Sequence, residues 1–163
     1  MNKINFLFVT LFGIGKLKKI PGSYASLATT ILLFFLFHIF SFSPNFILIG
    51  ILIIFFISLY TVNIFIKNLD NKDPKEVVID EFIGQSIPIC MFEIAHEGTK
   101  EINQVLTFYF IIFILFRIFD IVKPYPVSYY DKNFKNSFGV IMDDVCAGLY
   151  VVAVLVSYMV ITS

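Results

Sequence analysis

Long apolar runs separated by short polar segments dominate the chain. Residues 24–42 and 44–66 contain no Asp, Glu, Lys or Arg, and a short Ser/Pro/Asn-containing turn joins them. An α-helix needs roughly 20 predominantly apolar residues to cross the hydrocarbon core of a bilayer. The pattern therefore predicts two membrane-spanning helices that form a tight hairpin.

Three further runs are long enough to cross a bilayer as helices. Residues 104–122 carry two charges near their end, and residues 145–162 are uncharged. Residues 77–95 are short, have acidic residues near both ends and contain Pro88. We expect five spans, with the alternative that residues 77–95 enter and leave the membrane on the same side.

The N-terminal residues 1–14 begin like a secretory signal, with Lys3 before an apolar stretch, but they lack an A-x-A type cleavage site. They predict an interfacial helix that stays on the protein. No repeat or flexible linker divides the chain, so we expect an all-α integral membrane protein whose residues 1–163 form one membrane-embedded domain.

Composition excludes two classes of protein. The chain is 58% hydrophobic and only 15% charged, whereas soluble domains are about 45–50% apolar and about 25% charged. Twelve Lys and Arg balance twelve Asp and Glu, so the basic excess of a nucleic-acid-binding protein is missing. The sequence therefore favours a membrane protein that does not bind nucleic acid.

Lysines indicate how the chain is oriented in the membrane. In the five-span arrangement Lys100 lies on one side, and ten lysines lie on the other: Lys3, Lys16, Lys18, Lys19, Lys67, Lys72, Lys75, Lys123, Lys132 and Lys135. Short cytoplasmic loops carry the excess of Lys and Arg. We expect a cytoplasmic N-terminus and a C-terminus on the opposite side of the membrane.

A group of ionisable residues lies near the cytoplasmic ends of three predicted helices. Such residues are costly at the edge of hydrocarbon and indicate function by default. The group consists of Asp80, Glu81, Arg117, Asp120, Lys123, Asp143 and Asp144. Because they lie at one depth, we expect one shared site.

Five acids against two cations leave an excess of negative charge that requires a cation. Oxygen ligands favour Mg²⁺, whereas zinc prefers His or Cys. The histidines His38 and His96 and the apolar-run cysteines Cys90 and Cys146 do not fall in this group. Two alternatives stay open: Asp143 as a helix N-cap, and Arg117 with Asp120 as a structural ion pair.

A basic, glycine-containing segment at residues 13–26 leads into the first span. It matches neither the dinucleotide fingerprint nor the P-loop. Backbone N–H groups at Gly22 and Ser23, where a helix begins, are suited to bind an anion. The alternative is a basic segment that rests on anionic lipid.

Together these features suggest chemistry on a lipid phosphate at the membrane surface. The C-x5-R motif of cysteine phosphatases and the D-x-D nucleophile motif are absent, and the two histidines do not support a phosphohistidine. Metal-assisted attack by water remains.

Three blocks of residues resemble the phosphatidylglycerophosphatase A family of bacterial membrane enzymes. They include PGSYAS at residues 21–26, IDEFIG at residues 79–84, and FRIFDIVKPYP at residues 116–126 followed by GVIMDDV at residues 139–145. The resemblance implies Mg²⁺-dependent removal of the terminal phosphate from phosphatidylglycerophosphate, an anionic lipid, to give phosphatidylglycerol.

We assign roles within this resemblance by their chemistry. Asp80, Asp120, Asp143 and Asp144 are expected metal ligands, and Glu81 is a ligand or the general base for water. Asp80 and Asp144 count, with Glu81, as the catalytic residues. Arg117 and Lys123 would hold the phosphate, assisted by Gly22 and Ser23, and Asp131 would organise a loop.

The chain departs from the family pattern at Ile79 and Tyr125, where tryptophan is usual, and at Asn136-Ser137, where two glycines are usual. None of these changes removes a charged group. Two other functions stay open: a lipid phosphotransferase, whose D-G-x-x-A-R signature is absent, and a small transporter or channel, which would distribute charges through the bilayer depth.

Overall fold

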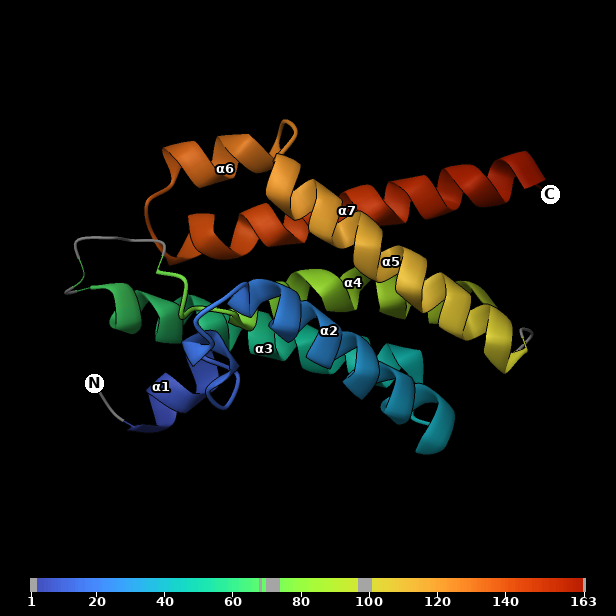
Figure 1. The fold of residues 1–163 in the computed structure, drawn as a ribbon, viewed down its shortest axis with the longest axis horizontal. Coiled ribbons are helices and arrows are strands. Elements are labelled where there is room, and N and C mark those ends of the chain that lie inside the picture. Colours follow the sequence, from blue (N-terminus) through green and yellow to red (C-terminus); the bar gives the residue numbers. More distant parts are fainter. Residues whose placement is uncertain (1–2, 68, 70–73, 97–100, 163) are drawn as a thin grey trace.

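The computed structural model describes residues 3–67, 69, 74–96 and 101–162, and all regular secondary structure in these residues is helical. No strand occurs among these residues, so the all-α prediction is confirmed for them. A 3-10 turn, η1, precedes the second α-helix, and a π-helix, η2, extends it (Figure 1). The elements are α1 (Lys3–Val9), η1 (Ile14–Lys16), α2 (Pro21–Phe34), η2 (Phe35–Ile39), α3 (Pro44–Ile66), α4 (Ile79–His96), α5 (Ile102–Val122), α6 (Val127–Asn133) and α7 (Ser137–Thr162).

Four helical segments in the described residues are long and apolar enough to cross a membrane. They are Pro21–Ile39, Pro44–Ile66, Ile102–Val122 and Ser137–Ile161, and they correspond to four of the five predicted spans. The last helix begins at residue 137 and not at the predicted 145. The uncharged apolar run begins only after the two aspartates, which is why the prediction started there. The helix itself extends through these charged residues because neighbouring groups pair with them.

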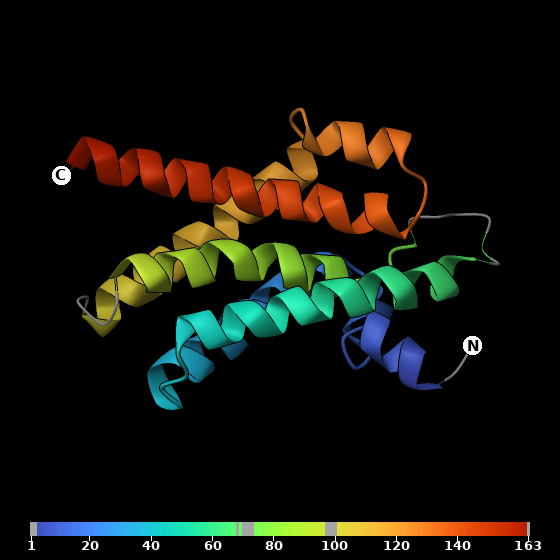
Figure 2. The same cartoon turned by 180° about the vertical axis from the view of Figure 1, so that it is seen from behind.

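The predicted fifth span, residues 77–95, forms α4 but is not among these four segments, because its acidic residues lower its hydropathy. The structure therefore does not confirm the number of five. Eleven of the 18 residues of α4 are buried, against four of 23 in α3. The helix α4 lies inside the bundle, with α3 on one side and α5 and α7 on the other (Figures 1 and 2).

Small residues bring α4 and α7 together. A Cβ atom on Gly84 would lie 2.5 Å from the carbonyl oxygen of Asp144, and a Cβ atom on Gly148 would overlap the carbonyl oxygen of Gly84. Close backbone approach through glycines is a common way for helices to pack in membranes. This contact places the start of α4 beside the acidic turn of α7.

The N-terminal helix is shorter than predicted. Among the described residues 3–13, the α-helix covers Lys3–Val9, and Leu11 and Phe12 adopt positive φ angles of 45° and 56°. The chain turns there because Val9 has a tertiary partner: its carbonyl oxygen accepts a hydrogen bond from the Val78 N–H at 3.1 Å. The turn directs the basic segment toward α4.

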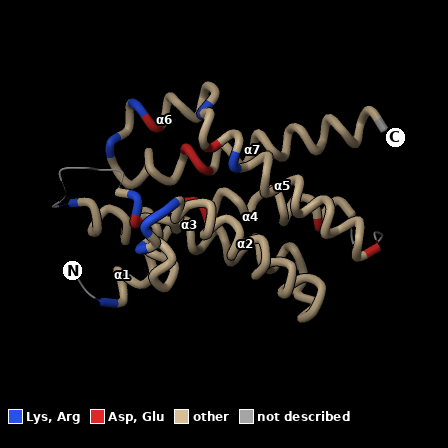
Figure 3. The backbone as a smooth tube through the Cα atoms, viewed as in Figure 1, with Lys and Arg blue, Asp and Glu red and all other residues tan. Residues whose placement is uncertain are grey.

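The described Lys and Arg residues gather at one end of the bundle, where α2, α4 and α7 begin and α3 and α5 end (Figure 3). This clustering agrees with the lysine count from the sequence. Two lysines of that count, Lys72 and Lys100, lie outside the described residues.

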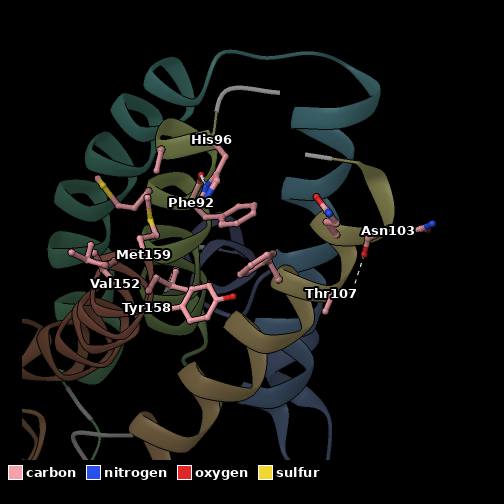
Figure 4. Close-up of a pocket in the computed structure, with 13 residues that line it drawn as sticks. Phe92, His96, Asn103, Thr107, Val152, Tyr158 and Met159 are labelled. Atoms are coloured by element: carbon pink, nitrogen blue, oxygen red, sulfur yellow. Dashed lines mark hydrogen bonds between the residues drawn. The ribbon is translucent and has the colours of Figure 1, made fainter. Parts of the chain in front are cut away.

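At the opposite end, α4, α5 and α7 enclose a crevice of about 630 Å³ (Figure 4). Phe92 and Tyr158 lie in it, together with His96, Asn103 and Thr107. None of the residues that line it is Asp, Glu, Lys or Arg. It therefore does not offer the groups that phosphate chemistry needs.

A buried carboxylate joins three helical segments near this end. Glu93 of α4 accepts a hydrogen bond from the Tyr109 hydroxyl of α5 at 2.8 Å, and the same oxygen lies 3.2 Å from Nε2 of His38 in η2. The π-helix η2 carries His38 into this contact. His38 is thus half-buried, and it pairs with an acid.

Candidate active site

A cleft of about 470 Å³ opens at the charged end of the bundle, between the starts of α2, α4 and α7 and the end of α5. It brings together all nine residues that the sequence singled out. They are Gly22, Ser23, Asp80, Glu81, Arg117, Asp120, Lys123, Asp143 and Asp144. These residues are distributed over more than 120 positions of the chain, so the cleft exists only in the folded state.

Three carboxylates form a compact group in this cleft. Asp80 and Glu81 lie in the first turn of α4, and Asp144 lies in α7. One carboxylate oxygen from each falls within 4.8 Å of the others. Asp80 and Asp144 are buried, with relative exposures of 7% and 4%. Three anions this close in a poor dielectric repel one another unless a cation lies between them.

The three carboxylates fit a hard divalent cation. They supply oxygen ligands only, which suits a hard cation better than it suits zinc, whose sites mostly include His or Cys. In addition, Oε2 of Glu81 is buried and has no hydrogen-bond partner among the described residues. A buried carboxylate oxygen without a hydrogen-bond partner in such a cluster is available to bind a metal ion.

The other two acids of the cleft are paired with cations and stand outside this group. Oδ2 of Asp120 lies 2.8 Å from Nη1 of Arg117, one helical turn earlier in α5. Oδ2 of Asp143 lies 2.7 Å from Nζ of Lys123. Both acids were predicted as metal ligands. The structure shows them first as partners of the two cations.

Lys123 is held by two carboxylates. Its ammonium also lies 2.7 Å from Oδ1 of Asp131 in α6, which agrees with the predicted loop-organising role of that residue. Burial by itself lowers the pKa of Lys123, but the carboxylates of Asp143 and Asp131 outweigh it and raise the pKa above the ordinary value. Lys123 therefore keeps its proton to a higher pH than an ordinary lysine does.

Asp143 is not a helix N-cap. It is the seventh residue of α7, and its Oδ1 accepts a hydrogen bond from the N–H of Asp144 at 3.0 Å. The N-cap alternative assumed that the helix begins near the aspartates. The eight residues from 137 to 144 form its first two turns.

The first turn of α2 closes one side of the cleft. Ile20 adopts a left-handed conformation, and Pro21 is the first residue of the helix. A Cβ atom on Gly22 would overlap Oε1 of Glu81 and lie 3.4 Å from Nη1 of Arg117. Only a glycine leaves room there for the acid and the guanidinium.

Sequence reasoning did not assign a role to Ser26. Its hydroxyl donates to the carbonyl oxygen of Gly22 at 3.0 Å and accepts from Nη1 of Arg117 at 3.4 Å. Ser26 therefore connects α2 with the guanidinium. The sequence signal that could have identified Ser26 is its position one helical turn after Gly22, within the PGSYAS block.

Comparison with known proteins identifies the family. The model of the phosphatidylglycerophosphatase A family matches residues 7–159, which is nearly the whole chain. The chain belongs to the phosphatidylglycerophosphatase A family. The resemblance stated from the sequence is thereby confirmed.

Two curated relatives support this assignment to the phosphatidylglycerophosphatase A family. Phosphatidylglycerophosphatase A of Haemophilus influenzae is 32% identical over 157 residues, which cover 95% of this chain and 88% of that protein. Phosphatidylglycerophosphatase A of Escherichia coli K12 is 28% identical over 148 residues, which cover 88% and 77%. No solved structure matches the chain.

Proposed function

We propose that this protein removes the terminal phosphate of phosphatidylglycerophosphate and releases phosphatidylglycerol and inorganic phosphate. The relatives named for this activity match almost the whole chain. The observation that carries the proposal is that Asp80, Glu81 and Asp144 converge in one cleft with Arg117. A metal-dependent phosphomonoesterase uses such a combination of a metal-binding group and a phosphate-binding cation.

Asp80 and Asp144 are the proposed ligands of Mg²⁺, and Glu81 is either a third ligand or the base that accepts a proton from the attacking water. A divalent cation bound there would polarise the phosphoryl oxygens and make water a stronger acid. The Asp80 carboxylate is also held in place for binding a metal ion, because its Oδ1 accepts a hydrogen bond from the Glu81 N–H at 3.0 Å. That hydrogen bond limits the rotation of the Asp80 carboxylate.

Arg117 is the proposed clamp for the terminal phosphate. Its Nη1 is positioned by Asp120 and Ser26, while its Nε is buried without a hydrogen-bond partner among the described residues. A guanidinium binds phosphate through its planar fork of donors. Asp120 therefore acts as a positioning residue for Arg117.

Gly22 and Ser23 line the cleft beside this clamp. The Ser23 N–H already donates to the carbonyl oxygen of Ile20 at 3.1 Å. The Gly22 N–H and the Ser23 hydroxyl are the groups left to contact the phosphate.

Glu81 is the proposed base for the attacking water. The water oxygen forms the new bond to phosphorus, and Glu81 accepts its proton. The bond between phosphorus and the glycerol oxygen breaks, its electron pair stays on that oxygen, and the oxygen takes up a proton from solvent and leaves as a hydroxyl, while Glu81 returns its proton to solvent. The Lys123 ammonium, held by Asp131 and Asp143, would offset part of the negative charge on the phosphoryl oxygens.

We place the cleft at the cytoplasmic face of a bacterial inner membrane, with five crossings. Four long apolar helices and the buried α4 support this arrangement. The gathering of Lys and Arg at the cleft end supports a cytoplasmic location of that end (Figure 3). The C-terminal end of α7 then lies on the outer side.

The decisive experiment is phosphate release from phosphatidylglycerophosphate by the purified protein, with and without Mg²⁺. We expect release that EDTA abolishes and Mg²⁺ restores. Asp80→Asn and Asp144→Asn should abolish it in folded protein, whereas Glu101→Gln, an exposed acid at the start of α5, should not. Full activity of both aspartate variants, or ion flux through liposomes without phosphate release, would refute the proposal.

A further inference from the structure

Two lysines that line the cleft, Lys18 and Lys75, differ from its other two cations. Arg117 pairs with Asp120, and Lys123 pairs with Asp143 and Asp131. Lys18 and Lys75 also line the cleft and are exposed, and neither forms an ion pair with any described residue. The cleft therefore has two unbalanced regions: three acids suited to a cation, and two lysines suited to an anion.

The segments that carry these lysines are packed against each other. Lys18 lies between η1 and α2, and Lys75 lies just before α4. A Cβ atom on Gly15 would overlap the carbonyl oxygen of Glu76, so the two backbones are in direct contact. The hydrogen bond from Val78 to Val9 ties the same two segments a few residues away. The two segments that carry Lys18 and Lys75 therefore lie side by side at the edge of the cleft.

The size of the cleft is that of a whole headgroup. Its volume of about 470 Å³ falls in the range of roughly 300–1,000 Å³ that is typical of small-molecule sites. Such a volume exceeds what one phosphate requires. The proposed substrate carries two phosphates joined by a glycerol: the monoester that is removed and the diester that links it to the lipid.

We propose that Lys18 and Lys75 bind the phosphodiester of the substrate and so select lipids whose headgroup carries two phosphates. This inference rests on the proposed function. The monoester occupies the region of the three acids and Arg117, and the two lysines neutralise the second phosphate. A lipid with a single phosphomonoester, such as phosphatidate, leaves the lysines unused.

The test compares the wild type with the double variant Lys18→Gln/Lys75→Gln in neutral detergent micelles, which removes attraction to an anionic membrane. The readouts are kcat and KM for phosphatidylglycerophosphate, and inhibition by two products that each mimic one half of the substrate. Inorganic phosphate probes the monoester region. Phosphatidylglycerol probes the diester region.

We expect KM to rise about ten-fold or more, because a hydrogen bond to a charged group contributes about 1.5–3 kcal/mol. Inhibition by phosphatidylglycerol should weaken by a similar factor, while kcat and inhibition by inorganic phosphate stay near the wild-type values. Lys18→Arg/Lys75→Arg should retain the wild-type KM. Lys132→Gln, at an exposed lysine of α6 that does not line the cleft, is the control for loss of surface charge.

An unchanged KM in the double variant would overturn the inference, and so would equal weakening of inhibition by both products. A similar rise in KM with Lys132→Gln would assign the effect to general surface charge and would also overturn the inference. Failure of the wild type to release phosphate is a different result, because it refutes the proposed function itself.

Discussion

Gly22 and Glu81 lie in direct contact, although 59 positions separate them in the chain. The contact is so close that a Cβ atom on Gly22 would overlap Oε1 of the Glu81 side chain. The first turn of α2 therefore limits where the proposed base can lie. This contact makes the proposed base sensitive to any side chain at position 22.

Gly22→Ala should displace Glu81 and reduce kcat/KM about 100-fold, because displacements near 1 Å at a reacting group cost that much. Gly50→Ala in α3 is the matched control, since nothing lies within 4 Å of a Cβ atom at that position. Phosphate release measures the effect, and thermal unfolding in detergent verifies folding. Equal activities of the two variants would show that the contact with Glu81 does not matter.

Asp120 and Asp80 should differ in metal binding, although both are acids of one cleft. Asp80→Asn and Asp144→Asn should weaken Mn²⁺ binding, measured by electron paramagnetic resonance, by at least about ten-fold. Asp120→Asn should keep Mn²⁺ affinity near wild type and lower kcat, because its partner is Arg117 at 2.8 Å. Loss of Mn²⁺ binding in Asp120→Asn would instead make this residue a ligand.

Lys123→Met should reduce the free energy of unfolding by about 1–3 kcal/mol, because it leaves the Asp131 and Asp143 carboxylates without their cation. Lys132→Met on the exposed face of α6 should have little effect. Chemical denaturation in detergent compares the two. A loss no greater than that of the control would show that the carboxylates find other partners.

The pKa of Lys123 also fixes how this stabilisation depends on pH. Its pKa is raised in the folded state, mainly by Asp143 against the opposing effect of burial. The folded protein therefore holds this proton more tightly than the unfolded chain does. The contribution of Lys123 should be fully present below the ordinary value of 10.5 and should decline only as the pH rises through the folded-state pKa.

Tyr109→Phe should lower the unfolding free energy by about 1 kcal/mol, because it removes the hydroxyl that donates to Glu93 at 2.8 Å inside the bundle. Tyr60→Phe is the control, since Tyr60 of α3 is 69% exposed. Thermal unfolding in detergent measures both. The Mg²⁺ dependence of phosphate release should stay unchanged in both variants, because Glu93 lies at the far end of α4 from Asp80.

The proposed site could be predicted from the sequence to the level of residue identity. Acids at the ends of apolar runs are costly, and this cost marks Asp80, Glu81, Asp143 and Asp144 without any coordinates. The partner of each of these four acids could not be predicted from the sequence. Asp143 and Asp144 are adjacent in the chain, yet one pairs with Lys123 and the other joins Asp80 and Glu81.

The four long apolar helices follow from the sequence alone, because hydropathy is a local sum over about 20 residues and such apolar runs form helices in lipid. Tertiary structure decided that α4 lies in the centre, that α1 stops at Val9, and that η2 brings His38 to Glu93. These features depend on how closely helices approach at Gly84 and Gly148 and on how each helix is rotated. Neither quantity is contained in a local pattern, since each is fixed only when side chains distant in sequence pack together.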